Sequence, residues 1–405
     1  MADTTTSLSD SIRTQYVEEY IEAAQFEKFY DQLAQPVGRP MSELKRGSSV
    51  QVEFLGDMAP GTTAISETTD ITPQTLRDAT ASITPTSVGE ALQCSELLLV
   101  QAFTDYGAAM FRRVGKNMQE SVEAKAKNAA TQGTNVMRGG SVQVAARTTL
   151  DAGTTTHLIS DLVFTDAAAR LAMNKVPSYV DNLGKSWGAY LHPYQYRELI
   201  SGAGGNISSI VLYQDKAILL NYELGRLGGF RLLVSPWAKV VSGGAANANA
   251  VETVLSTAEQ ALEKTFNVAA VTNLGSWAKG WLFVGSTHET ANTHIQNGEW
   301  VRYIGHTGST VTIIGEGANG GLRFDHAVGE AVSNDDPVYL TVFGGPASLA
   351  KVFATEVGEY GQVVGPKRDG IVDQFVTLGH KWYGGYGRIS ESYILRLENP
   401  SRTDA

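Results

Sequence analysis

The chain has 405 residues and a formal net charge of −10 at pH 7. Proteins that track nucleic-acid phosphates carry a surplus of lysine and arginine, so this acidic chain is not expected to bind DNA along its surface. Hydrophobic residues make up 42% of the chain. The sequence contains no run of ~18 consecutive apolar residues, which a membrane-spanning helix would need. One cysteine, Cys94, and a first segment without signal-peptide features indicate synthesis in a reducing compartment.

The first predicted element is a helix over residues 7–34. Its apolar and aromatic residues recur every four positions at Ile12, Tyr16, Tyr20 and Ala24, which is the period of one helix face. That face can pack on its own domain or on a neighbouring subunit, and the sequence leaves both alternatives open.

A long two-stranded arm is predicted next. Val50, Val52 and Phe54 alternate with polar residues, residues 79–88 form a second strand-like run, and a polar stretch over residues 56–78 lies between them. The arm has almost no apolar face, and an isolated two-stranded ribbon is marginal in water. We therefore expect the arm to lie on another part of the chain or on another molecule.

Residues 97–131 are predicted to form a helix about 50 Å long, at ~1.5 Å per residue. Its apolar positions step by four, at Tyr106, Met110, Val114, Met118 and Val122. Its most concentrated basic cluster, called the basic face below, is Arg112, Arg113 and Lys116. A solvated helix surface is the ordinary interpretation of such a cluster.

The rest of the chain mixes helices and strands. Helices are predicted at residues 162–174 and 193–200, with strands at residues 187–191 and 230–234. Residues 239–347 contain short strands separated by turns, which is typical of a small sandwich or barrel. Within them, Ser256 and Glu259 have the spacing of a capping box and predict a helix start. Strands return after residue 351, the last over residues 390–397.

The chain carries no convincing catalytic or cofactor motif. Residues 315–320 match a dinucleotide glycine pattern, but the strand-like residues after them predict a hairpin turn, because a nucleotide site needs a helix there. The sequence around Gly184 lacks the first glycine of a phosphate loop, because Tyr179 occupies that position. The histidines lack metal-ligand spacing, and Cys94 has no nearby histidine. We therefore expect no cofactor, no metal and no enzymatic activity.

The arm and the basic face have opposite charges. Between Gly47 and Glu90 the only basic residue is Arg77. The acidic residues proposed for contacts between subunits are Glu53, Asp57, Glu67, Asp70 and Asp78. If the arm lies on a neighbouring copy, pairing with the basic face would fix its register.

The order of these parts resembles that of a known family. A helical N-terminal arm, an extended hairpin, a long helix and a mixed region with a late strand follow one another as in the major capsid proteins of tailed bacteriophages. Residues 223–236 (ELGRLGGFRLLVSP) and 375–398 (FVTLGHKWYGGYGRISESYILRLE) are similar to the glycine turn and the C-terminal strands of one branch of that family.

The resemblance implies an α+β capsid fold with an inserted all-β domain. The implied parts are an N-terminal arm (1–34), an extended hairpin or E-loop (35–95) and a spine helix with part of the P-domain (96–146). An A-domain-like region (147–237), the inserted domain (238–347) and a return to the A/P core (348–405) complete the division. Some relatives crosslink through a lysine on the extended loop, but residues 46–90 contain no lysine.

The implied function is that of a structural subunit in an icosahedral shell. The chain would form pentamers and hexamers around double-stranded DNA without reading its sequence. Its partners would be scaffolding, portal and decoration proteins. The chain would be synthesised in the host cytoplasm and would reside in the virion capsid. The alternative is a β-rich binding or adhesion protein, suggested by residues 239–347. A hydrolase is disfavoured because no nucleophile, base or metal set converges.

Overall fold

The computed structural model describes residues 28–44, 49–55, 78–101, 106–181, 184–201, 223–241, 252–271, 280–285, 298–315, 319–334, 337–369 and 374–401, with residues 58, 60–62, 73, 75 and 317. The chain divides into two compact units. Unit 1 contains residues 1–27, 34–122 and 349–390, and unit 2 contains residues 28–33, 123–348 and 391–405. Each unit is described by itself.

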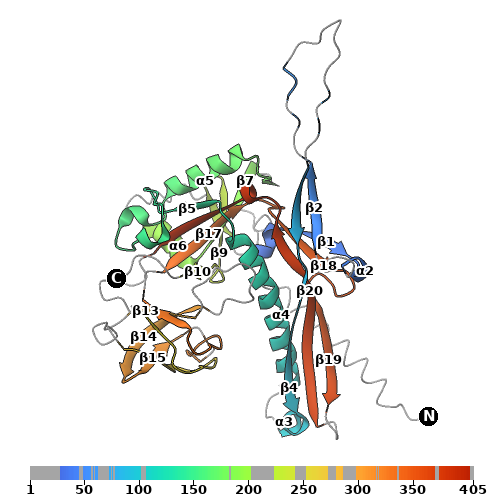
Figure 1. Ribbon diagram of the computed structural model, residues 1–405, viewed down its shortest axis with the longest axis vertical. Coiled ribbons are helices and arrows are strands. Elements are labelled where there is room, and N and C mark those ends of the chain that lie inside the picture. The colour runs from blue at the N-terminus through green and yellow to red at the C-terminus, as the bar shows by residue number, and fades with distance from the viewer. Residues whose placement is uncertain are drawn as a thin grey trace, which may run out of the picture. The chain divides into compact units, whose positions relative to one another are not determined.

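Unit 1 is built on a five-stranded sheet (Figure 1). Its strand order is β1 (Ala34–Arg39), β18 (Leu349–Ala354), β20 (Phe375–Arg388) and β19 (Gln362–Asp369), and β4 (Thr86–Ser95) also pairs with β20. The β4 and β20 backbones approach closely at Gly89, where an added Cβ would lie 2.6 Å from the carbonyl oxygen of His380. Strands from distant parts of the sequence therefore share one small sheet.

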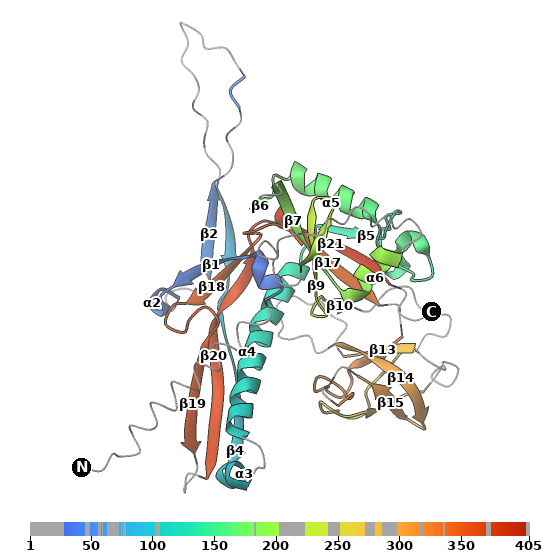
Figure 2. The same cartoon turned by 180° about the vertical axis from the view of Figure 1, so that it is seen from behind.

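Two helices follow β4. They are α3 (Glu96–Gln101) and α4 (Tyr106–Thr131), with residues 102–105 outside the described ranges. On α4, Met110, Phe111 and Val114 pack against Cys94 and Leu378 of the sheet, and both views show this part of α4 running along β4 and β20 (Figure 2). The helix predicted from the four-residue spacing is confirmed over α4.

The arm hairpin, which we define as β2 (Val50–Leu55) and β3 (Asp78–Ile83), is an antiparallel pair. The single strand predicted over residues 79–88 is wrong, because β3 pairs with β2 whereas β4 pairs with β20. The short helix α2 (Met41–Leu44) precedes the hairpin.

Unit 2 contains an eight-stranded sheet with the order β5 (Val136–Arg138), β21 (Ile394–Pro400), β17 (Val338–Gly344), β7 (Gly184–Leu191), β9 (Phe230–Val234) and β8 (Glu223–Leu227). The short strands β6 (Tyr179–Asp181) and β10 (Val240–Val241) pair with β7 and β17. The helices of unit 2 include α5 (Asp161–Met173), α6 (Pro193–Ser201) and the short 3-10 helices η2 (Arg147–Thr149) and η3 (Thr155–His157). Phe164 of α5 packs edge-on against Phe230 and Phe343 of the sheet. The predicted α+β organisation is confirmed.

A second sheet of unit 2 has six strands and its own core. Its order is β11 (Glu252–Val254), β16 (Ala331–Ser333), β13 (Gly280–Val284), β14 (Glu299–Thr307), β15 (Thr310–Ile314) and β12 (Thr265–Asn267). The buried residues of this core, among them Phe266, Leu282 and Val311, all come from residues 255–332. The helix start predicted at Ser256 is wrong, because the Glu259 carboxylate accepts hydrogen bonds from Thr257 and from the amide of Asn267 instead.

The two ends of the chain differ in part from the prediction. Residues 7–27 of the predicted first helix lie outside the described residues. Its last residues form the 3-10 helix η1 (Tyr30–Leu33) and the start of β1. The last predicted strand begins later than expected, because η7 (Glu391–Tyr393) precedes β21.

Candidate assembly surfaces

The arm hairpin is fixed at one end to the core of unit 1. Val50, Val52 and Ile83 pack with the buried residues Leu44 of α2 and Val352 of β18. The sequence folds this way because alternate residues of a strand share one face, and here the apolar face of β2 is short. The hairpin is therefore held at the end that carries Val50 and Ile83.

The acidic candidates of the arm are only partly described. Glu53 is exposed and lies opposite Thr80 in the hairpin ladder, and Asp78 lies opposite Leu55. Asp57, Glu67 and Asp70 lie outside the described residues.

The basic face lies on the exposed side of α4. Arg112 and Arg113 are exposed, whereas Met110 and Val114 on the same helix are buried. Lys116 lies 3.8 Å from Glu120, one helical turn on, and both side chains are solvent-accessible. Among the described residues of one chain, no ion pair joins Glu53 to Arg112 or Arg113.

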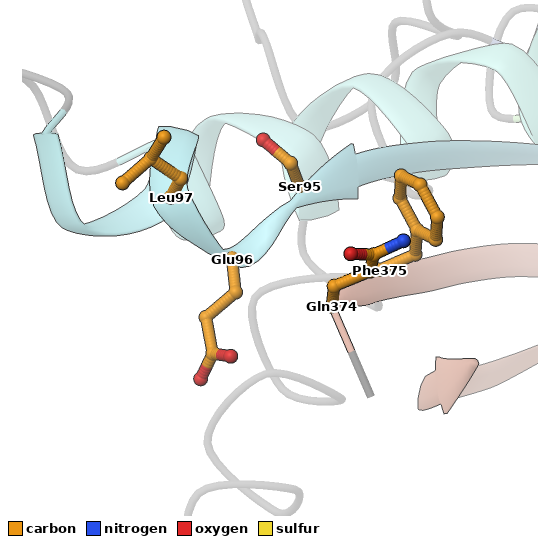
Figure 3. Close-up of a pocket in the computed structure, with 5 residues that line it drawn as sticks. All are labelled: Ser95, Glu96, Leu97, Gln374 and Phe375. Carbon is orange, nitrogen blue, oxygen red and sulfur yellow. The ribbon is translucent and has the colours of Figure 1, made fainter. Parts of the chain in front are cut away.

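A pocket of about 520 Å³ lies where β4 passes into α3, beside the start of β20 (Figure 3). Ser95, Glu96, Leu97, Gln374 and Phe375 line it. The Leu97 side chain is 63% exposed and Phe375 is 36% exposed. Large apolar side chains that gather on a surface commonly mark contact sites for other proteins. Sequence analysis missed this pocket because it joins residues that are nearly 280 positions apart.

The only charges at this pocket belong to an exposed ion pair, among the residues described there. Glu96 lies 3.3 Å from Arg368 of β19, and its amide donates to the carbonyl oxygen of Gln374 at 2.9 Å, which continues the β4–β20 ladder. One paired carboxylate beside two apolar side chains suits binding better than catalysis, since acid–base chemistry requires a group placed to exchange a proton with a substrate.

Unit 2 holds a buried charge cluster around Glu398 of β21. Its carboxylate contacts Arg138 at 2.8 Å, Arg147 at 2.6 Å and Arg396 at 2.9 Å. Burial alone would raise the pKa of Glu398, but the hydrogen bonds and charges of the arginines lower it below its usual value. The cluster ties β5, η2 and β21 together and is structural.

The six-stranded sheet holds a buried histidine between two carboxylates. Nε2 of His326 lies 2.9 Å from Glu299, and Nδ1 lies 2.7 Å from Glu330. A neutral imidazole has only one N–H donor, so two carboxylate partners require the charged form. Burial alone would lower the pKa of His326, but the hydrogen bonds and charges of both carboxylates raise it overall.

Within the described ranges, no three His, Cys, Asp or Glu side chains are grouped so that they could hold a metal ion. A helix long and apolar enough to cross a membrane is likewise absent from the part of the chain that the structure describes.

Comparison with known proteins identifies the fold. No protein-family model and no curated protein matches the sequence. Among solved structures, a chain from the capsid of Ralstonia phage GP4 is similar with a TM-score of 0.53 and 10% identity, over 92% of this chain and 88% of that chain. A chain from the head of Helicobacter pylori bacteriophage KHP40 gives 0.51 and 10%, with 92% and 88% covered. A capsid chain of the cyanophage P-SCSP1u gives 0.50 and 11%, with 93% and 89% covered.

The chain therefore has the fold of phage capsid proteins, and the predicted fold class is confirmed. The similarity covers both units, since it extends over about nine tenths of this chain and of the matched chains. At this low identity it shows the fold alone.

Proposed function

We propose that this chain is the structural, non-enzymatic subunit of an icosahedral phage head, and that it forms pentamers and hexamers around double-stranded DNA. The observation that carries the proposal is the capsid fold over 92% of the chain. The arm hairpin supports it, because a two-stranded ribbon with only a short apolar face gains stability on a second copy. The β-rich binding or adhesion alternative accounts only for the six-stranded sheet.

The partners follow from this role. Scaffolding, portal and decoration proteins would assist assembly in the host cytoplasm, and the finished subunit would reside in the virion. The net charge of −10 supports enclosure of DNA without tight adhesion, because like charges repel. Electron microscopy of the purified full-length chain, with and without its scaffolding protein, tests the role. Closed shells or capsomers are expected, and monomers under both conditions would contradict it.

We further propose that the acidic arm of one subunit contacts the basic face of its neighbour. The exposed positions of Arg112, Arg113 and Glu53 support this contact. Opposite charges steer association and fix register more than they add affinity, so the effect belongs to assembly and not to folding.

Charge reversal tests this contact. Arg112→Glu with Arg113→Glu should slow or prevent shell formation, and Glu53→Lys with Asp78→Lys should partly restore it. The matched control, Arg112→Lys with Arg113→Lys, keeps the charge and should assemble like the wild type. Normal assembly of the reversed variant, or no rescue by the lysines, would contradict the pairing.

We propose that the six-stranded sheet is a domain inserted in the chain between β10 and β17 of the eight-stranded sheet. Val241 of β10 and Val338 of β17 are direct antiparallel partners, so the chain leaves the eight-stranded sheet and returns to it at adjacent positions. Domains are readily inserted where the two connections lie close together. Residues 338–344, within the predicted domain of residues 238–347, pair with β7 and β21, so we propose residues 242–337 as the extent of the insertion.

A further inference from the structure

A short segment of the chain is clipped into unit 2 by a buried carboxylate. Residues 28–33 are the only part of the first 122 residues that belongs to unit 2. Glu123 of α4, which is 4% exposed, accepts hydrogen bonds from the backbone amides of Phe29, Tyr30 and Asp31. A carboxylate on these amides satisfies donors at the start of η1 that have no partner within the helix.

The surroundings of the clip are aromatic. Phe29 and Tyr30 are 1% and 0% exposed, and both rings pack against Tyr190 of β7, at 5.1 Å and 5.7 Å between centroids. The Tyr30 hydroxyl accepts a hydrogen bond from the amide of Lys239 at 3.3 Å. Removing residues 28–33 would expose this apolar surface, so Glu123 holds a segment whose aromatic side chains are well packed.

The ionisable groups that face Glu123 are Asp31, Tyr30 and Tyr190. Asp31 is also buried, at 9% exposure. On α4 itself, the charged side chains one turn away are Glu120, which pairs with Lys116, and Lys127, whose ammonium lies over the Trp237 ring. The nearest charge acting on Glu123 is therefore a second carboxylate, and two buried carboxylates repel when both are ionised.

We propose that Glu123 is a proton-dependent clip, which fixes residues 28–33 in unit 2 more firmly when its carboxyl group is protonated than when it is ionised. The protonated group still offers a carbonyl oxygen to the amides of η1, and it removes the repulsion with Asp31. A capsid-fold subunit with such a clip holds the base of its N-terminal segment in a pH-dependent way.

The direction of the effect follows from the pKa of Glu123. Burial raises it to about 7, the three amides oppose the rise, and Asp31 adds to it. A carboxyl group whose pKa is raised on folding stabilises the folded form at low pH and loses that contribution as pH rises through the folded-state value. The clip therefore loosens as the pH passes from the mildly acidic to the mildly alkaline range.

Hydrogen exchange of the full-length chain tests the clip. The readout is the protection of the Phe29, Tyr30 and Asp31 amides at about pH 6 and about pH 8.5, corrected for intrinsic exchange rates. In the wild type, protection should fall by about 10-fold between the two, since each pH unit between the unfolded-state and folded-state pKa values costs about a factor of ten and pH 6 lies about one unit below the folded-state value. Glu123→Gln keeps an amide acceptor without the charge and should show equal protection at both.

Two further variants make the outcome decisive. Glu120→Gln, on the same helix, should keep the wild-type pH dependence. Asp31→Asn removes the second carboxylate and should give a smaller loss of protection, which also tests the clip if Glu123→Gln does not fold. Protection in the wild type that does not change with pH, or an unchanged pH dependence in Glu123→Gln, would overturn the proposal.

Discussion

The buried carboxyl groups of Glu398 and Glu123 lie in contrasting surroundings and respond to pH in opposite ways. Glu398 has three arginine partners and a lowered pKa. The stability it contributes is present above the ordinary carboxyl pKa and lost as pH falls. Glu123 faces Asp31 and its pKa is raised, so its contribution has the opposite sign.

His326 gives a residue-scale prediction. Its raised pKa means that it stabilises the six-stranded sheet fully below the ordinary histidine pKa of 6.5, and that this stability is lost as pH rises through the folded-state value. His326→Gln should destabilise the sheet by about 3 kcal/mol at mildly acidic pH, because it leaves buried carboxylates without a positive charge.

The measurement is the free energy of opening of the six-stranded sheet, from hydrogen exchange at several pH values in both proteins. His306→Gln is the matched control, because His306 lies on an outer part of β14 and contacts a backbone carbonyl. A wild-type sheet whose stability does not fall on alkalinisation would contradict the charged state of His326.

Residue types could be placed from the sequence, but these partners could not. The spacing of Met110 and Val114 predicts a buried helix face, and the structure confirms it. Glu398 and Arg138 lie 260 positions apart, so no local pattern links them. The proposed inter-subunit contacts of Glu53, Arg112, Arg113 and Lys116 stay predictions, since the contact would join two chains.

At the scale of elements, strands could be predicted well where turn residues lie at their ends. Gly228 and Gly229, at φ values of 57° and 87°, close the hairpin between β8 and β9, since a tight turn of this kind needs two residues in the left-handed region. The glycine-rich stretch predicted this turn. The prediction of a single strand over residues 79–88 is wrong because the alternation of polar residues continues through two strands, β3 and β4, which pair with different partners.

The packing of α4 on the five-stranded sheet gives an element-scale prediction. Leu378 of β20 is 1% exposed, and its cross-strand partner Leu92 is 41% exposed. Leu378→Ala should lower the free energy of unfolding of unit 1 by about 3 kcal/mol, because the cavity forms beneath α4. Leu92→Ala is the matched control and should cost less than ~1 kcal/mol. Equal losses in urea unfolding of the two variants would contradict this packing.

At the scale of the whole molecule, the fold could be predicted because the order of arm, hairpin, long helix and mixed region is itself informative. The boundaries of the β-rich part could not be read as well, since a short strand such as β17 has the same composition whichever sheet it joins. The pairing of Val241 with Val338 is visible only in three dimensions.

Removal of the proposed insertion is the prediction at this scale. Replacing residues 242–337 with Asn-Gly should leave the eight-stranded sheet intact, because a two-residue turn can join adjacent antiparallel strands. The shortened chain should be folded by circular dichroism and should keep the protection of its β17 and β21 amides. Loss of that protection would show that the six-stranded sheet is an integral part of unit 2.

The central claim is that copies of this chain complete one another's surfaces in a shell. An electron cryo-microscopy reconstruction of particles assembled from the full-length chain tests it most directly. The account predicts pentamers and hexamers in which β2 and β3 of each copy lie on a neighbour, with Glu53 near the neighbour's basic face. A hairpin that contacts only its own chain in the assembled particles would contradict the claim.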